Sequence, residues 1–213
     1  MRMDRSNRKN LIEDMNMKPV ILCDVDGVVL EWMSKIPEFL AKRGFNPDKA
    51  IRAYSYGEFL TLSEITGLPE ENAVKLIEEY NSSEWIKYLS PYKDALAVVN
   101  ILKHTYDFIA VTAIGTASDC AKYRMHNLQF WYPNAFTDIH IVGINESKTD
   151  ILNSYEQSIF IDDSPNYCKE GVNAGHYTIR LIRDRRIDSV PTMHAKDWFD
   201  VATLIKQYEL FKT

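Results

Sequence analysis

An apolar run that ends in two carboxylates limits the fold of this chain more than any other feature. The apolar residues Val20–Cys23 are followed by Asp24, Val25, Asp26 and Gly27. A short run of this kind is typical of a strand that is buried on both faces of a parallel sheet. Open α/β sheets bind their ligands at the carboxyl ends of such strands. We therefore expect Asp24 and Asp26 at a ligand-binding edge, where an acidic pair is costly unless a cation binds it.

Taken alone, this segment also fits a strand that runs into an ordinary Asp-Gly turn. A second apolar segment, 108–115, favours the functional interpretation because it ends at Thr112, Ala113 and Gly115. A threonine hydroxyl and free backbone N–H groups at a strand end can hold phosphate oxygens. The alternative for Thr112 is a β-branched residue that merely finishes a strand.

Two further segments add charged groups of the required kinds. Lys148 follows the strand-like residues 139–144 and precedes an expected helix, so its ammonium group could neutralise a phosphate or a carboxylate. The apolar residues 159–161, which follow Ser158, lead into Asp162 and Asp163, a carboxylate pair that suits Mg²⁺. The alternatives are a solvated surface lysine and an Asp-rich turn before Pro165.

In this order, the segments resemble the four motifs of the haloacid dehalogenase superfamily of phosphohydrolases: Asp24-x-Asp26, Thr112, Lys148 and Asp162-Asp163. The resemblance covers residues 20–183. It implies an α/β fold with a Rossmann-like parallel sheet flanked by helices, and a small helical cap inserted after the first core strand. In that superfamily, an Asp two residues after the first one is the pattern of the phosphatase and phosphotransferase branches, not of the dehalogenases.

The resemblance also implies roles for these residues. Asp24 would be the nucleophile and Asp26 the general acid and base. Thr112 and Lys148 would bind the phosphoryl group, with Lys148 also anchoring the nucleophile. The Mg²⁺ cofactor would be held by Asp24, the Asp26 carbonyl and Asp162, with Asp163 assisting.

Within the superfamily, the chain is most similar to the 5′(3′)-deoxyribonucleotidases. The likeness lies in residues 24–29, 88–95, 147–149 and 161–165. Two positions depart from that family: Ala113 stands where a second hydroxyl residue often follows the motif threonine, and Ser164 stands where an arginine often precedes the proline. Ala113 remains a candidate substrate-binding position beside Thr112, but nucleotide specificity is left open.

The distance between the first two core strands predicts an insertion. The first core strand is expected at about Val20–Asp24, and the next core strand begins only near Phe108. This gap is far longer than an ordinary βα connection. We expect residues 1–17 to be a poorly ordered extension, 18–30 and 89–213 to form the core, and 31–88 to form the helical cap. Core helices are expected at 94–104, 117–130 and 197–208, and a fifth core strand at 177–182.

Aromatic residues are frequent in the expected cap. Tyr54, Tyr56 and Phe59 lie around a glycine-containing break between helices, and we expect them to line a pocket for a nucleobase. The alternative for any one of them is hydrophobic packing of a small subdomain. The favoured substrate is a nucleoside monophosphate; the alternatives are a sugar phosphate, a 3′-phosphate on nucleic acid, or a catalytically silent binding protein.

Composition places limits on partners and location. The 213 residues carry a net charge of −5 without a basic stripe, so we expect a small phosphorylated substrate and no stable nucleic-acid partner. No apolar run is long enough to span a bilayer, so no membrane partner is expected. Cys23, Cys120 and Cys168 are odd in number and widely spread, which favours reduced thiols and a cytoplasmic protein. A homodimer is left open.

Overall fold

The computed structural model describes residues 18–183 and 190–212, so the predicted extension 1–17 lies outside the described residues. Apolar runs such as Val20–Cys23 form the strands of one parallel sheet with the order β5-β4-β1-β6-β7-β8. The strands are β1 (Val20–Cys23), β4 (Asp107–Ala113), β5 (Phe136–Val142), β6 (Ile159–Asp162), β7 (Tyr177–Leu181) and β8 (Met193–Ala195). The strand order reverses at β1, and this is where doubly wound α/β folds bind ligands.

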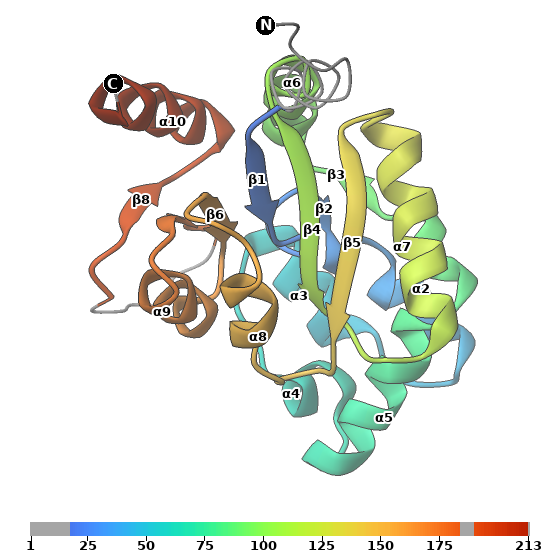
Figure 1. Ribbon diagram of the computed structural model, residues 1–213. Coiled ribbons are helices and arrows are strands. Elements are labelled where there is room, and N and C mark those ends of the chain that lie inside the picture. The colour runs from blue at the N-terminus through green and yellow to red at the C-terminus, as the bar shows by residue number, and fades with distance from the viewer. Residues whose placement is uncertain (1–17, 184–189, 213) are drawn as a thin grey trace, which may run out of the picture.

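Alternate residues of the strands enter two separate cores, because successive side chains point to opposite faces of a sheet. Ile21 and Cys23 of β1 belong to the larger core, and Leu22 belongs to the smaller one. The larger core includes residues of α6 (Lys93–Leu102), α7 (Ser118–Trp131) and α10 (Trp198–Lys212). The smaller core includes residues of α8 (Thr149–Asn153), with α9 (Pro165–Asn173) packed against it. The predicted parallel sheet covered by helices is confirmed (Figure 1).

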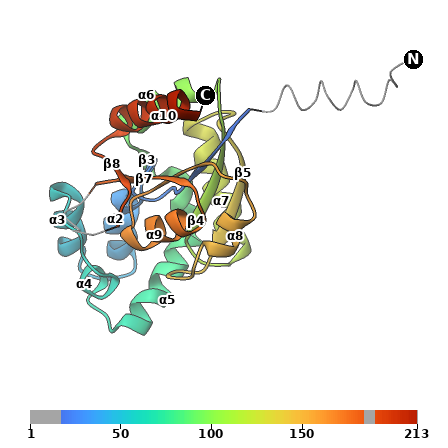
Figure 2. The ribbon, with the colours of Figure 1, turned by 60° about the vertical axis from the view of Figure 1, so that its left-hand side comes forward.

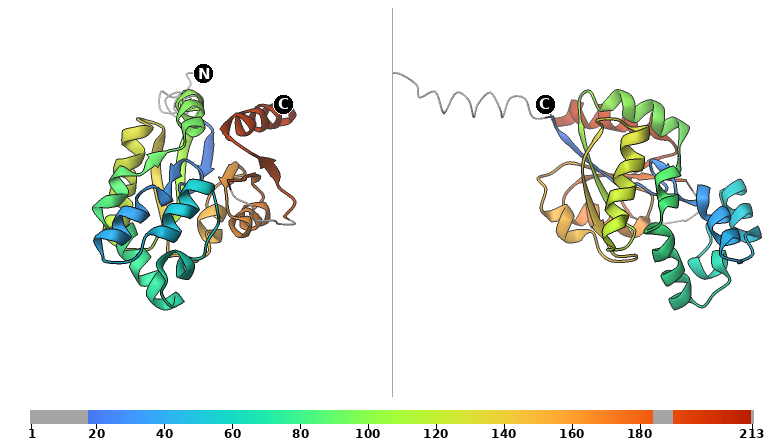
Figure 3. Two further views of the ribbon diagram at one scale, coloured as in Figure 1. Left: turned by 180° about the vertical axis from the view of Figure 1, so that it is seen from behind. Right: turned by 90° about the vertical axis from the view of Figure 1, so that its right-hand side faces the viewer.

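The long connection between β1 and β4 holds further helices and a small ribbon. Strands β2 (Leu30–Glu31) and β3 (Ser90–Pro91) pair antiparallel and bracket this segment. Between them lie η1 (Trp32–Lys35), α2 (Ile36–Lys42), α3 (Asp48–Tyr56), α4 (Leu62–Thr66), α5 (Glu70–Asn81) and η2 (Glu84–Tyr88). Strands β1, β4 and β5 point toward α3, α4 and α5 (Figure 1), and the other views place these helices far from α6 and α10 (Figures 2 and 3).

The Asn81 side chain joins α5 to the core and also to η1 within the helical segment. The Asn81 side chain of α5 donates a hydrogen bond to the Ile114 carbonyl at 3.0 Å and accepts one from the Trp32 indole at 2.9 Å. The segment therefore contacts the chain just after the end of β4. The cysteines are all buried and unpaired, as predicted. Among the described residues, no helix is both long and apolar enough to cross a membrane.

Candidate active site

The predicted motif residues emerge at one edge of the sheet. In the sheet β1 lies between β4 and β6, so Asp24 leaves β1 beside the ends of these two strands. Thr112 lies near the end of β4, and Asp162 is the last residue of β6. Lys148 is the N-cap residue of α8 and reaches the same place. The parallel sheet thus gathers groups that lie far apart in the sequence.

Lys148 connects two of the carboxylates. Its Nζ donates to Asp24 Oδ1 and to Asp162 Oδ2, each at 2.7 Å. Lys148 and Asp162 have no exposed surface, and Asp24 is 6% exposed. Burial alone would lower the pKa of Lys148, but the charges of Asp162 and Asp24 outweigh it and raise that pKa. The lysine therefore remains charged and offsets part of the acidic charge.

Glu170 of α9 fixes the loop that carries Lys148. Its Oε2 accepts the Lys148 backbone N–H at 2.7 Å and the hydroxyl groups of Ser147 and Thr149 at 3.0 and 3.2 Å. Three hydrogen bonds on one carboxylate oxygen leave the loop little freedom. Sequence reasoning missed Glu170, because a glutamate in a polar helix usually lies in solvent.

The carboxylates of Asp24, Asp162 and Asp163 form an acidic cluster. One oxygen from each lies within 4.8 Å of the others. Burial raises the pKa of Asp162 above its usual range, against the opposing charge of Lys148. Such a cluster of hard oxygen donors fits a divalent cation such as Mg²⁺. Asp24, Asp162 and Asp163 are therefore suitable ligands.

Gly27 is required by the shape of this cluster. Its φ of +79° lies in the left-handed region, and a Cβ at this position would lie 2.9 Å from Asp163 Cγ. The turn that it forms is tight, since the Val25 carbonyl accepts the N–H groups of both Val29 and Leu30 at 2.9 Å. The turn after β1 and the acidic loop after β6 can approach so closely only because residue 27 has no side chain.

Thr112 has a hydroxyl group without a partner. The residue is 1% exposed, and among the described residues its Oγ1 has no hydrogen-bond partner. Buried polar atoms are rarely left unsatisfied, and those that are call for an explanation. A phosphate oxygen at the strand ends would supply the missing bond. Ala113 follows at the last position of β4 and is half-buried.

Asp26 is paired with an arginine that sequence reasoning missed. Arg124 Nη2 donates to Asp26 Oδ2 at 2.8 Å, and Nη1 lies 2.7 Å from Oδ1. Burial raises the pKa of Asp26 to about 7, although the Arg124 charge opposes the shift. A carboxyl group with a pKa near neutrality can both give and take a proton, as general acid–base chemistry requires. Arg124 lies in the middle of α7, where nothing in the sequence distinguishes it from a surface residue.

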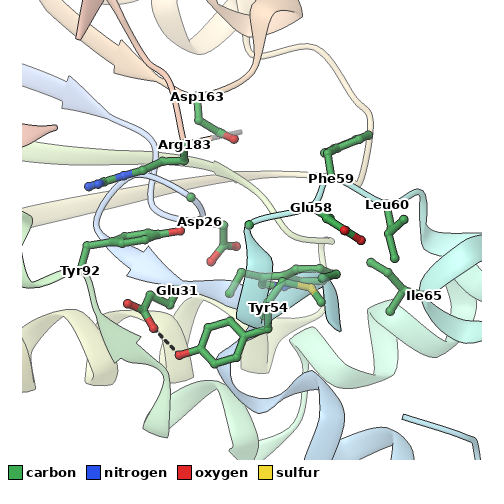
Figure 4. Close-up of a pocket in the computed structure, with 15 residues that line it drawn as sticks. Asp26, Glu31, Tyr54, Glu58, Phe59, Leu60, Ile65, Tyr92, Asp163 and Arg183 are labelled. Atoms are coloured by element: carbon green, nitrogen blue, oxygen red, sulfur yellow. Dashed lines mark hydrogen bonds between the residues drawn. The ribbon is translucent and has the colours of Figure 1, made fainter. Parts of the chain in front are cut away.

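A cavity of about 470 Å³ lies beside Asp26 and Asp163 (Figure 4). Core residues form one end, and the helical segment supplies the other, with Tyr54, Phe59 and Leu60 among its lining residues. The cavity has the size of a small-molecule site. Of the three predicted pocket aromatics, Tyr54 and Phe59 line it, whereas Tyr56 is 72% exposed and is not among the lining residues.

Two carboxylates line the cavity away from the acidic cluster. Glu31 of β2 accepts a short hydrogen bond from the Tyr54 hydroxyl, and Glu58 follows α3 (Figure 4). Burial, together with the hydrogen bond to Glu31, raises the pKa of Tyr54 to about 12, so this hydroxyl stays protonated. The cationic lining residue Arg183 pairs with Asp94 at 2.9 Å and stacks on the Tyr92 ring. The cavity thus combines aromatic walls with acidic hydrogen-bond acceptors.

Comparison with known proteins gives one curated relative. No protein-family model matches the chain. An uncharacterized 32.4 kDa protein from the Gp30–rIII intergenic region of enterobacteria phage T4 is 35% identical over 191 residues, which span 87% of this chain and 69% of the phage protein.

Solved structures share the fold at low sequence identity. A candidate phosphatase from Clostridium difficile is 15% identical, with a TM-score of 0.65 over 89% of this chain and 99% of that one. YfnB, a candidate HAD hydrolase from Bacillus subtilis bound to magnesium, is 16% identical, with a TM-score of 0.58 over 90% of this chain and 100% of that one. An L-2-haloacid dehalogenase is 15% identical, with a TM-score of 0.57 over 89% of this chain and 100% of that one. These likenesses show a fold that phosphatases and dehalogenases share.

Proposed function

We propose that this chain, which belongs to the same family as the uncharacterized 32.4 kDa protein of phage T4 and has the fold of the haloacid dehalogenase-like hydrolases, is a Mg²⁺-dependent phosphomonoesterase. The observation that carries the proposal is the buried contact of Lys148 with both Asp24 and Asp162. This contact holds a carboxylate nucleophile beside a cation and a metal-binding carboxylate. The unpartnered Thr112 hydroxyl adds a donor for a phosphate oxygen.

The reaction proceeds in two displacements on phosphorus. A carboxylate oxygen of Asp24 forms a bond to phosphorus, the ester P–O bond breaks, and the leaving alkoxide takes the proton of Asp26. Water then attacks the aspartyl-phosphate and gives a proton to Asp26, and inorganic phosphate leaves with Asp24 restored. Lys148 and Thr112 bind the phosphoryl oxygens through both steps. Asp24, Asp162 and the Asp26 carbonyl, assisted by Asp163, would hold Mg²⁺, which supplies positive charge that lets an anionic nucleophile approach an anionic phosphate.

The substrate that we propose is a nucleoside monophosphate, cleaved as in the 5′(3′)-deoxyribonucleotidases. Support comes from the cavity beside Asp26, because it offers aromatic rings at Tyr54, Phe59 and Tyr92 together with the acceptors Glu31 and Glu58. Bases stack on such rings, and their amino groups donate to such acceptors. The same two carboxylates disfavour a leaving group with a second phosphate. The unpaired, buried cysteines support cytoplasmic activity.

A hydrolysis screen tests the proposal. The purified protein is incubated with nucleoside 5′- and 3′-monophosphates, sugar phosphates, a 3′-phosphorylated oligonucleotide and a 2-haloacid, each with Mg²⁺, with Ca²⁺ or with excess chelator. We expect phosphate release from nucleoside monophosphates that needs Mg²⁺, stops on chelation and is poorly supported by Ca²⁺. Full activity in chelator contradicts the metal mechanism, and preferred halide release identifies a dehalogenase. Tight nucleotide binding without turnover identifies a silent binding protein.

A further inference from the structure

The guanidinium of Arg124 is buried completely at the edge of the proposed catalytic centre. Arg124 has no exposed surface, while the Asp26 side chain is 20% exposed. The two residues are 98 positions apart and come from different elements, α7 and the turn after β1. Nη2 donates a hydrogen bond to Asp26 Oδ2 at 2.8 Å, and Nη1 forms an ion pair with Oδ1 at 2.7 Å without the alignment of a hydrogen bond. One charge-assisted hydrogen bond and a second close contact to the same carboxylate restrict the direction of the Asp26 side chain as well as its distance.

The surroundings of Arg124 show that Asp26 is its main partner. Among the described residues, neither its Nε nor its Nη1 has a hydrogen-bond partner, and its one hydrogen bond goes to Asp26. A buried guanidinium with few hydrogen bonds costs stability unless it is paired with a carboxylate. A role in packing alone would be served as well by an apolar side chain of similar size. The arginine therefore serves to hold the Asp26 carboxylate in position.

Asp26 also faces the cavity, among whose lining residues it is found (Figure 4). A substrate whose phosphate lies at Asp24 and Thr112 would place its ester oxygen near this carboxyl group. The geometry points to Arg124 as a positioning residue that holds Asp26 in the direction of the leaving oxygen. This inference rests on the proposed function, in which Asp26 gives its proton to the departing alkoxide.

A positioning role for Arg124 has a consequence that a role in stability does not have. An alkoxide such as the 5′-oxygen of a nucleoside needs a proton as the P–O bond breaks, whereas 4-nitrophenolate leaves without one. General acid catalysis is typically worth about 10²–10⁴-fold. Loss of Arg124 should therefore reduce kcat/KM selectively for substrates that release an alkoxide. Because kcat/KM covers only the steps through release of the leaving group, the later attack of water does not enter the comparison.

The experiment measures kcat/KM for a nucleoside monophosphate and for 4-nitrophenyl phosphate, in the presence of Mg²⁺. The variants are Arg124→Met, Arg124→Lys, Asp26→Asn and the double variant Arg124→Met/Asp26→Asn. Asn127→Ala is the matched control, because Asn127 is also buried in α7 but donates to the carbonyls of Lys87 and Leu89. Within the described part of the chain, no hydrogen bond or ion pair joins Asn127 to Asp26, so this variant should change kcat/KM for both substrates alike.

We expect Arg124→Met to lower kcat/KM for the nucleoside monophosphate about 10²-fold and kcat/KM for 4-nitrophenyl phosphate much less. The values for Arg124→Lys should lie between those of Arg124→Met and the wild type. The double variant should be no slower than Asp26→Asn alone, since the two residues act as one unit. An equal loss on both substrates, or additive losses in the double variant, overturns the inference while leaving the proposed function intact. If Arg124→Met does not fold, the ratio of kcat/KM for the nucleoside monophosphate to kcat/KM for 4-nitrophenyl phosphate is measured in Arg124→Lys instead, and an unchanged ratio overturns the inference. A wild-type protein that hydrolyses neither substrate overturns both proposals.

Discussion

Lys148 Nζ lies 2.7 Å from Asp162 Oδ2, and neither side chain has any exposed surface. A charged pair buried so completely is costly to form, and the loss of one member leaves the other charge without a partner. Replacement of such a pair by well-packed apolar residues is often neutral for stability or even stabilising. The charges of Lys148 and Asp162 are therefore better explained by what they bind than by what they stabilise.

Replacing Lys148 by Met should both destabilise the protein and abolish phosphate release. The free energy of unfolding should fall by about 3–5 kcal/mol, because Asp24 and Asp162 would stay buried without their cation. Chemical denaturation in the presence of chelator measures this change. The control is Lys75→Met, which removes a surface pair with Glu71 at 2.6 Å and should cost no more than about 1 kcal/mol. Equal costs for the two variants would contradict the buried arrangement.

A methyl group at Gly27 should disturb the metal site. Gly27 and Gly44 have the same φ of +79°, but a Cβ on Gly27 would lie 2.9 Å from Asp163, whereas one on Gly44 would have no atom within 4 Å. Both alanine variants should lose about 1–2 kcal/mol of stability from the backbone conformation. Only Gly27→Ala should also weaken Mg²⁺ binding, measured by titration calorimetry. Unchanged Mg²⁺ affinity in Gly27→Ala would show that Asp163 lies outside the metal site.

The metal-free protein should lose stability as pH rises from about 4 to about 7. Burial raises the pKa of Asp26 from 3.8 to about 7, so in this interval the folded protein holds a proton that the unfolded chain has released. The free energy of unfolding then falls with rising pH, and Asp26 contributes at most about 4 kcal/mol to the change. Asp26→Asn, which cannot ionise, should show a flatter pH profile of chemical denaturation. Identical slopes in the two proteins would contradict the raised pKa.

The cavity aromatics should affect recognition but not chemistry. Phe59→Ala should remove a stacking contact with the base that is worth about 1–3 kcal/mol of binding free energy. For a nucleoside monophosphate, kcat/KM should fall by the corresponding factor. The loss should be much smaller with a minimal aryl phosphate, which reaches Asp24 without filling the cavity. Tyr56→Ala is the control, since this side chain is 72% exposed and does not line the cavity. The same loss in both variants, or an equal loss on both substrates, would assign Phe59 to packing.

The strand ends of the site could be predicted because local patterns specify them. An apolar run followed by carboxylates, as at Asp24 and Asp162, indicates both the strand and its functional end. The strand β8 (Met193–Ala195) was not predicted, because its three residues include His194 and an exposed Met193 and show no apolar pattern. Helix α10 continues to Lys212, beyond the predicted end at residue 208, because its last turns carry no stop signal such as Gly or Pro.

The supporting residues could not be predicted for a different reason. Arg124 and Glu170 lie in helices, and the groups that they hold, the Asp26 carboxylate and the Lys148 backbone N–H, are 98 and 22 positions away. Their roles depend on how α7 and α9 pack on the sheet, and no spacing in one sequence records that packing. Tyr56 shows the opposite case: its place near Gly57 suggested a pocket residue, but the end of α3 turns it to solvent.

Hydrolysis by the Asp24→Asn variant tests the central claim most directly. Wild-type and variant proteins are compared with the preferred nucleoside monophosphate in Mg²⁺, and thermal unfolding verifies that the variant is folded. The account predicts no phosphate release above background, because an amide is a poor nucleophile and uncatalysed phosphate-monoester hydrolysis is slower than enzymatic rates by factors of up to ~10²¹. Turnover near the wild-type rate by a folded Asp24→Asn protein would contradict it.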